Sequence, residues 1–268
     1  MIVWPVAAMA TPSLNSDMVS VRIVRELALE AQVIVCCSDE GVETRARAVL
    51  ERNGVRTGAL RFVRYPCEIQ FPRDFGAEVT VDEQGNRRRV DFRFTMYGQF
   101  SEEEEISKRL RAFTAFHAAE IGVSDVVAAD LVGEGGDREF NGRGAMMAIR
   151  ETEVDKRNPD KTVEQVEAEF RRVFGVEKII WIPRASYDDE YAYSGPIPSE
   201  NGAFTAFRAS SAHGHIDEIC RFADPRTVIV ARIDAEEASR SALHALNKER
   251  LDQAYEAVRA ASDVSGAP

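Results

Sequence analysis

A degenerate internal repeat is the feature of this sequence that most constrains its fold. Turn-forming residues lie between runs of strand-forming residues in three segments, which predicts β-hairpins at 78–94, 137–149 and 216–233. A helical pattern follows each hairpin, and a short strand follows the first two of these helices. We therefore expect an α/β fold of repeated ββαβ units, forming a single domain over residues 1–268.

Helical and strand patterns also alternate outside the hairpins. Helices are predicted at 19–31, 44–53, 102–120, 162–174 and 235–262, and strands before Trp4-Pro5 and at 33–37, 60–65 and 178–182. Gly54 and Gly175 are suited to end two of these helices. Ser101 with Glu104 predicts a capping box at the start of one helix, and Asp234 predicts the cap of a long last helix.

The segment before each hairpin carries the most unusual polar residues of the chain. These segments are 71–76, 133–136 and 213–217. Equivalent positions of a repeated unit tend to point at the same place, so Asp74, Glu134, His215 and Asp217 are expected to converge. Each residue alone has a structural alternative. Asp74 could pair with Arg73, Glu134 could be a loop carboxylate, and His215 could be a hydrogen-bonded core histidine.

Three carboxylates and one histidine suit either a metal ion or a cationic substrate. A metal site would favour more histidines or a D-x-D spacing, and these segments contain neither. A planar guanidinium offers a fork of N–H donors, and two carboxylates can hold both of its edges. His215 and Glu134 could then move protons during attack at the central carbon. That reaction also needs a nucleophile, usually a cysteine thiolate.

None of the four cysteines has the pattern of a reactive or metal-binding residue. No C-x-x-C pair is present, which argues against a zinc knuckle or a redox dithiol. Cys36 and Cys37 lie in the apolar strand pattern 33–37, where they are expected to act as small core residues. Cys67 stands alone, and Cys220 follows the alternation of a strand and is also expected in the core. This cysteine usage is typical of a cytoplasmic protein.

Charge and composition limit the partners of the chain. Against 34 Lys and Arg residues stand 45 Asp and Glu, a net charge of −11, which argues against nucleic-acid binding and is compatible with a cationic substrate. No apolar run approaches the roughly 20 residues of a membrane span, and the apolar N-terminus lacks the basic start of a signal peptide. Ala242, Leu246 and Ala254 are spaced for packing in a core or between two copies, so a homo-oligomer stays possible.

Five motifs together resemble the agmatine deiminase / bacterial (Porphyromonas-type) peptidylarginine deiminase family, in its order and at about its spacing. They are Arg73-Asp74-Phe75-Gly76, Glu134-Gly135-Gly136, Lys156-Arg157-Asn158-Pro159, Lys178–Ile182 and Gly214–Asp217. The resemblance covers nearly the whole chain. The first motif departs from the family pattern, because Phe71 and Ala77 stand where the family has Trp and Pro.

The resemblance implies a pentein α/β-propeller of five ββαβ-type units around a central site. It further implies that Asp74 and Asp217 bind a guanidinium, that His215 is the general acid/base, and that Glu134 completes the clamp or assists proton transfer, with Arg73 among the substrate-binding residues. The implied reaction converts agmatine or peptidyl-arginine to a ureido product and ammonia through a Cys-thiouronium intermediate, in putrescine and polyamine biosynthesis. It implies no cofactor and no metal.

The nucleophile is the largest departure from the family. The family has a cysteine near the C-terminus in a Gly-rich segment ending Gly-x-His-Cys, and this chain has no such segment. We therefore expect about four of five units, with the nucleophile beyond Pro268. Two alternatives remain open: a truncated or vestigial guanidinium-binding protein without catalysis, and a metal-dependent hydrolase that uses the same carboxylates and His215.

Overall fold

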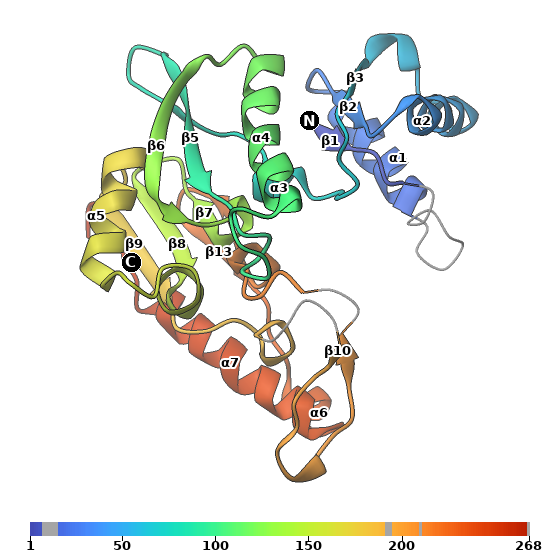
Figure 1. Ribbon diagram of the computed structural model, residues 1–268. Coiled ribbons are helices and arrows are strands. Elements are labelled where there is room, and N and C mark those ends of the chain that lie inside the picture. The colour runs from blue at the N-terminus through green and yellow to red at the C-terminus, as the bar shows by residue number, and fades with distance from the viewer. Residues whose placement is uncertain (7–15, 191–194, 209–210, 267–268) are drawn as a thin grey trace.

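The computed structural model describes residues 1–6, 16–190, 195–208 and 211–266 (Figure 1). The α/β class predicted from the sequence is confirmed. Within the described residues, the strands form three three-stranded and two two-stranded sheets, in the orders β1-β2-β3, β4-β5-β6, β7-β8-β9, β10-β11 and β12-β13. The closed propeller and its number of units stay predictions.

The first unit is an all-parallel sheet with two helices. It comprises β1 (Ile2–Val3), α1 (Ser16–Leu27), β2 (Ile34–Cys37), α2 (Glu40–Arg52), the 3-10 helix η2 (Thr57–Ala59) and β3 (Arg61–Arg64). Helix α2 begins at Glu40, earlier than predicted, because the Asp39 side chain accepts a 2.9 Å hydrogen bond from the Val42 N–H and caps the helix. Gly54 follows its end with φ of 76°, as predicted.

The second unit has the predicted ββαβ order. It comprises the short helix α3 (Pro72–Phe75), β4 (Glu78–Val81), β5 (Arg87–Arg93), α4 (Glu105–Glu120) and β6 (Asp125–Val132). Strands β4 and β5 form the expected hairpin, and β6 pairs with β5 in parallel. The capping box predicted at Ser101 and Glu104 is wrong. Helix α4 starts only after Glu104, whose side chain makes no capping hydrogen bond.

The third unit repeats the same order. It comprises the 3-10 helix η3 (Gly135–Asp137), β7 (Arg138–Phe140), β8 (Ala145–Ile149), the π-helix η4 (Glu151–Lys156), α5 (Val163–Phe174) and β9 (Lys178–Ile182). The hairpin β7-β8 and the strand β9 after the helix match the prediction, and β9 pairs with β8 in parallel. Thr162 and Gln165 form a reciprocal capping box at the start of α5, and Gly175 ends it with φ of 70°.

The fourth unit contains the third predicted hairpin and the last helices. It comprises the 3-10 helices η5 (Tyr187–Asp189), η6 (Glu200–Gly202) and η7 (Ile216–Glu218), the strands β10 (Gly195–Pro196), β11 (Phe207–Arg208), β12 (Cys220–Asp224) and β13 (Thr227–Val230), and the helices α6 (Ala235–Ala238) and α7 (Ala242–Arg259). The prediction of one continuous last helix is wrong. Asp234 caps α6 as expected, but Ser241 caps a second helix through the His244 N–H.

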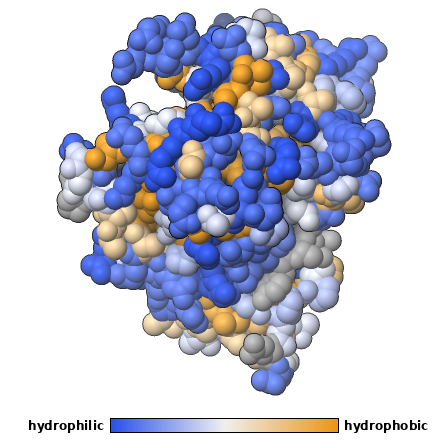
Figure 2. Space-filling view, turned by 60° about the vertical axis from the view of Figure 1, so that its left-hand side comes forward, coloured by the Kyte–Doolittle hydropathy of each residue, from blue (hydrophilic) through white to orange (hydrophobic). Residues whose placement is uncertain are grey.

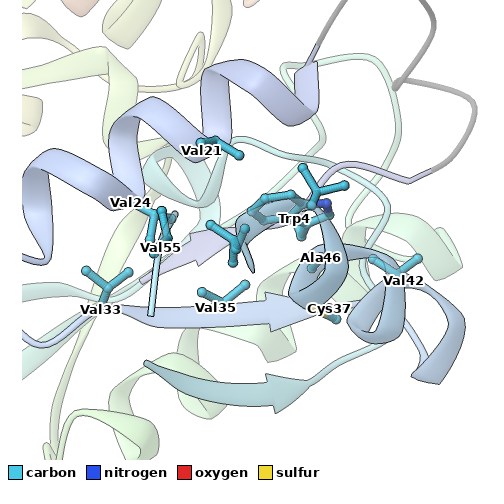
Figure 3. Close-up of a cluster of buried hydrophobic side chains, with 11 residues drawn as sticks. Trp4, Val21, Val24, Val33, Val35, Cys37, Val42, Ala46 and Val55 are labelled. Carbon is cyan, nitrogen blue, oxygen red and sulfur yellow. The ribbon is translucent and has the colours of Figure 1, made fainter. Parts of the chain in front are cut away.

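Neighbouring units are joined by shared hydrophobic clusters. Within the first unit, Trp4 packs with valines of α1 and β2, whose side chains point toward each other in Figure 3. A second cluster joins the first and second units through Val3 and Phe113, a third joins the second and third units, and a fourth packs α7 against β9 and β12. Sequential packing of this kind leaves the polar segments of successive units close to one another.

One face of the molecule is mainly polar (Figure 2). Figure 2 shows one face, on which hydrophilic side chains predominate and hydrophobic ones lie in small separate groups. In the part of the chain that the structure describes, no helix has the length and apolar character needed to cross a membrane.

Candidate active site

A cavity of about 1010 Å³ lies where the polar segments of three units meet. Asp74 in α3 and Gly135 in η3 line it. Asp217 in η7 and His215, the residue before η7, line it as well. The structure therefore brings together segments that lie far apart in the sequence, as the repeat predicted.

His215 is the centre of the cluster. Its Nδ1 atom lies 3.6 Å from Asp74 Oδ1 and 3.9 Å from Asp217 Oδ1, so two carboxylates flank the same ring nitrogen. Its Nε2 atom faces away from them, 3.8 Å from Glu134 Oε2 and 3.5 Å from Asp137 Oδ1. All four residues expected to converge do so, and Asp137, which the sequence reading missed, joins them.

The two glycines after Glu134 make this approach possible. A Cβ atom on Gly136 would lie 2.1 Å from His215 Nδ1 and 2.8 Å from Asp74 Oδ1. A Cβ atom on Gly135 would lie 2.0 Å from the backbone oxygen of Arg73. Both contacts are far below van der Waals distance, so only glycine lets η3 pass between the segments that carry Asp74 and His215.

The loop that carries His215 is fixed by a carboxylate 26 residues earlier. Asp189 Oδ2 accepts hydrogen bonds from the backbone N–H groups of Gly214 (2.8 Å) and His215 (3.2 Å). Its Oδ1 accepts from the Ser211 hydroxyl at 2.6 Å. Gly214 has φ of 111°, and a Cβ there would lie 2.2 Å from Thr152 Oγ1. Asp189 therefore holds the backbone that orients the imidazole.

Glu134 is held by an ion pair that has no exposed surface. Arg157 Nε donates a 2.7 Å hydrogen bond to Glu134 Oε2, and both side chains are 0% exposed. Burial opposes ionisation of Glu134, but Arg157 and His215 outweigh it and hold the pKa of this carboxyl below its usual value. Arg157 lies in one of the motifs that the sequence singled out, although no role was predicted for it.

Tyr97 ties two of the carboxylates together. Its hydroxyl donates a 2.8 Å hydrogen bond to Asp74 Oδ2, and its backbone N–H donates to Glu134 Oε1 at 3.2 Å. Burial is the largest influence on Asp74, and it raises the pKa of this carboxyl to about 6. No local pattern around Tyr97 indicates this role, because both partners come from other segments.

Arg73 is placed beside Asp217. Its Nε lies 3.3 Å from Asp217 Oδ2, and its terminal nitrogen donates to the backbone oxygen of Arg138 at 2.8 Å and approaches Glu139 Oε2 at 3.3 Å. Its guanidinium therefore contacts Asp217, one of the two carboxylates predicted to bind substrate.

Glu134, Asp137 and His215 could also offer ligand atoms to a metal ion, because one atom of each lies within 4.8 Å of the others. Arg157 already supplies a positive charge to this group, with Nε 2.7 Å from Glu134 and 4.0 Å from Asp137. A divalent ion there would be repelled by the nearby guanidinium of Arg157, which already neutralises these carboxylates. A metal therefore fits this group poorly.

The four cysteines, all within the described residues, are buried and none lines the cavity. Burial raises the pKa of Cys36, Cys37 and Cys220 to about 12 and that of Cys67 to about 11. The prediction that Cys36, Cys37 and Cys220 are core residues is confirmed. Among the described residues, the cavity is therefore lined by carboxylates, histidines and arginines but by no thiol.

Comparison with known proteins adds a family match. Residues 1–194 match the family described as Porphyromonas-type peptidyl-arginine deiminase. Among curated proteins, an agmatine deiminase of Stutzerimonas stutzeri is 26% identical over 222 residues, which is 79% of this chain and 51% of the relative. An agmatine deiminase of Pseudomonas aeruginosa is 24% identical over 210 residues, 75% of this chain and 48% of the relative.

Solved structures share the fold. An agmatine deiminase of Enterococcus faecalis matches with a TM-score of 0.75 and 17% identity, covering 99% of this chain and 64% of the other. A variant agmatine deiminase of C. jejuni with substrate bound matches with a TM-score of 0.69 and 19% identity, covering 97% and 67%. The chain thus spans about half to two thirds of the length of these relatives.

Proposed function

The chain belongs to the Porphyromonas-type peptidyl-arginine deiminase family, and from that membership we propose that its cavity binds a guanidinium cation and serves guanidine hydrolysis. The observation that carries the proposal is the pair of carboxylates at one histidine nitrogen. Asp74 and Asp217 lie 3.6 and 3.9 Å from His215 Nδ1 at the cavity wall. Two carboxylates so placed can accept the N–H donors of one guanidinium.

In this proposal Asp74 and Asp217 are the substrate-binding residues. Arg73 carries the same charge as the substrate, so it acts through Asp217, whose Oδ2 its Nε contacts at 3.3 Å. The side chain of Arg73 is 41% exposed, which allows it to move as the substrate cation approaches. Glu134 is fully buried behind His215, and its negative charge adds to that of Asp74 and Asp217 in attracting the cation.

His215 is the proposed general acid and base. The reaction adds water to a guanidinium and gives a ureido product and an ammonium ion. In the covalent route, a thiolate bonds to the guanidinium carbon, and the resulting tetrahedral adduct expels ammonia after its nitrogen gains a proton from His215. The thiouronium then reacts with water, whose proton returns to His215, and the thiol leaves.

The nucleophile of this route is not among the cysteines described above, because none of them lines the cavity. We propose that a cysteine outside these 268 residues supplies it in the whole enzyme. The same observation favours a second candidate, a guanidinium-binding protein without turnover. The two differ in chemistry and share the binding step.

Agmatine is the substrate we propose. The curated relatives described above are named agmatine deiminases, and a free guanidine of that size fits easily in a cavity of about 1010 Å³. The ureido product would then be a precursor of putrescine. Peptidyl-arginine is the alternative, since the open cavity could also receive an arginine side chain presented by a peptide.

Calorimetry with agmatine tests the proposal. Putrescine is the matched control, because it has an ammonium where agmatine has a guanidinium. We expect agmatine to bind at least about 100-fold more tightly than putrescine, without release of ammonia and without any effect of a chelator. Equal affinities for the two compounds would contradict the proposal that Asp74 and Asp217 bind a guanidinium. Turnover abolished by a chelator would favour the metal-dependent hydrolase instead.

A further inference from the structure

Two buried polar atoms of the site face each other, and neither makes a hydrogen bond. Among the described residues, neither Asp137 Oδ1 nor His215 Nε2 makes a hydrogen bond, and they lie 3.5 Å apart. Asp137 is 0% exposed and His215 is 3% exposed. Buried polar atoms without a partner are costly, so two of them this close indicate a contact that a proton between them would complete.

We propose that Asp137 is a positioning residue that keeps a proton on Nε2 of His215, so that proton exchange with the substrate takes place at Nδ1. The proposal rests on the proposed function for the role of Nδ1. That nitrogen faces the cavity between Asp74 and Asp217. When Nδ1 gives its proton to the leaving nitrogen, the ring becomes neutral. Its other proton stays on Nε2 and points to the carboxylate of Asp137. When water attacks, Nδ1 takes one proton back.

Asp137 is better suited to this role than Glu134. The oxygens of Glu134 already accept hydrogen bonds from the Tyr97 N–H at 3.2 Å and from Arg157 Nε at 2.7 Å. Asp137 uses only Oδ2, which accepts from the Glu134 N–H at 2.9 Å. That bond fixes the carboxylate and directs Oδ1 toward the imidazole. Asp137 therefore has a free acceptor and a fixed orientation.

The charges around His215 favour a protonated ring. Five carboxylates and one phenol lie around it or interact with its charge: Asp74, Glu134, Asp137, Asp217, Glu218 and Tyr97. The guanidinium of Arg157 is paired with Glu134. Burial alone would lower the pKa of His215, but Asp137 and the other carboxylates outweigh it and raise that pKa to about 10. Burial also raises the pKa of Asp137, whereas the charge of His215 lowers it, so the protonation of each group depends on the other.

Nitrogen NMR of histidine-labelled protein tests the proposal without any ligand. The chain has four histidines, and His215→Gln identifies the signals of His215. We expect Nε2 to carry a proton at pH 7 and the ring to titrate above about pH 8, against an ordinary midpoint near 6.5. Asp137→Asn should lower the midpoint by at least about one pH unit.

Asp130→Asn is the matched control, because it removes an exposed carboxylate that pairs with Lys161, outside the group that faces His215. It should move the midpoint by less than about 0.3 pH unit. An Asp137→Asn midpoint equal to that of wild type would overturn the proposal. If that variant does not fold, the wild-type spectrum decides, because an unprotonated Nε2 at pH 7 contradicts it. Absence of agmatine binding alongside the expected titration would overturn only the proposed function.

Discussion

The hydroxyl of Tyr97 donates a 2.8 Å hydrogen bond to Oδ2 of Asp74. Asp74 comes from the segment before the first hairpin, and Tyr97 comes from the loop after it, where Met96 and Tyr97 both have positive φ angles of 49° and 60°. Non-glycine residues adopt this backbone region at a cost, which is typical of functional sites. The strained loop thus serves to bring a donor to a buried carboxylate.

Tyr97→Phe should weaken agmatine binding most at mildly acidic pH. The hydrogen bond from Tyr97 lowers the pKa of Asp74, so its loss leaves a larger protonated fraction of that carboxyl near pH 6.5. A hydrogen bond to a charged group is worth about 1.5–3 kcal/mol, so we expect roughly 10-fold weaker binding at pH 6.5 and a smaller loss at pH 8. Calorimetry at both values checks this, and equal losses would contradict it.

The affinity of the wild-type protein for agmatine should rise with pH between 5 and 7. The pKa of Asp74 is raised to about 6 by burial, and only its ionised form holds a guanidinium. Burial, followed by the charge of Asp189, also raises the pKa of Glu218 in the cavity wall to about 7. Glu218→Gln is therefore measured in parallel. The rise should persist in Glu218→Gln and disappear in Asp74→Asn; the opposite pattern would assign it to Glu218.

Folding stability should fall as the pH rises above neutral. The folded pKa of His215 is raised to about 10 because the surrounding carboxylates outweigh burial. Its contribution is therefore complete below the unfolded pKa near 6.5 and is lost as the pH rises toward 10. The free energy of unfolding should drop by about 2 kcal/mol between pH 7 and 8.5. Denaturant titrations of His215→Gln should lack this drop, and an identical slope would count against the assignment.

Gly136→Ala should abolish agmatine binding and destabilise the fold. The new Cβ would lie 2.1 Å from His215 Nδ1 and 2.8 Å from Asp74 Oδ1, so it forces the two groups apart. Overpacking of this kind costs about 1–3 kcal/mol. Gly58→Ala is the control, because a Cβ at Gly58 would have no atom within 4 Å. Chemical denaturation and calorimetry check both effects, and normal binding by Gly136→Ala would refute this geometry.

The parts of the fold that depend on local signals could be predicted from the sequence. The three hairpins and the helix that begins at Thr162 agree with the structure because turn and cap residues act within a few positions. The break between α6 and α7 was missed, since the apolar spacing continues across it while Ser241 starts a new helix. The start of α4 was also misplaced, because Ser101 and Glu104 have a capping pattern that predicts a helix from residue 102, whereas the helix begins at Glu105.

The central site could be predicted only in part. The repeat placed Asp74, Glu134, His215 and Asp217 together, because equivalent positions of successive units meet at one place. The partners that hold them were not predictable. Asp189 acts on backbone N–H groups of residues 25 and 26 positions away, and no spacing rule reaches that far.

The most direct test of the account is calorimetry of agmatine binding to wild type, Asp74→Asn and Asp217→Asn. Both variants keep the size of the side chain. Burial already favours the neutral form of Asp74, so the Asp74→Asn variant should fold. Loss of one partner of a buried ion pair costs about 3–5 kcal/mol. The account predicts measurable binding by wild type and a loss of more than about 100-fold in each variant. Affinities within a few-fold of wild type in both variants would contradict it.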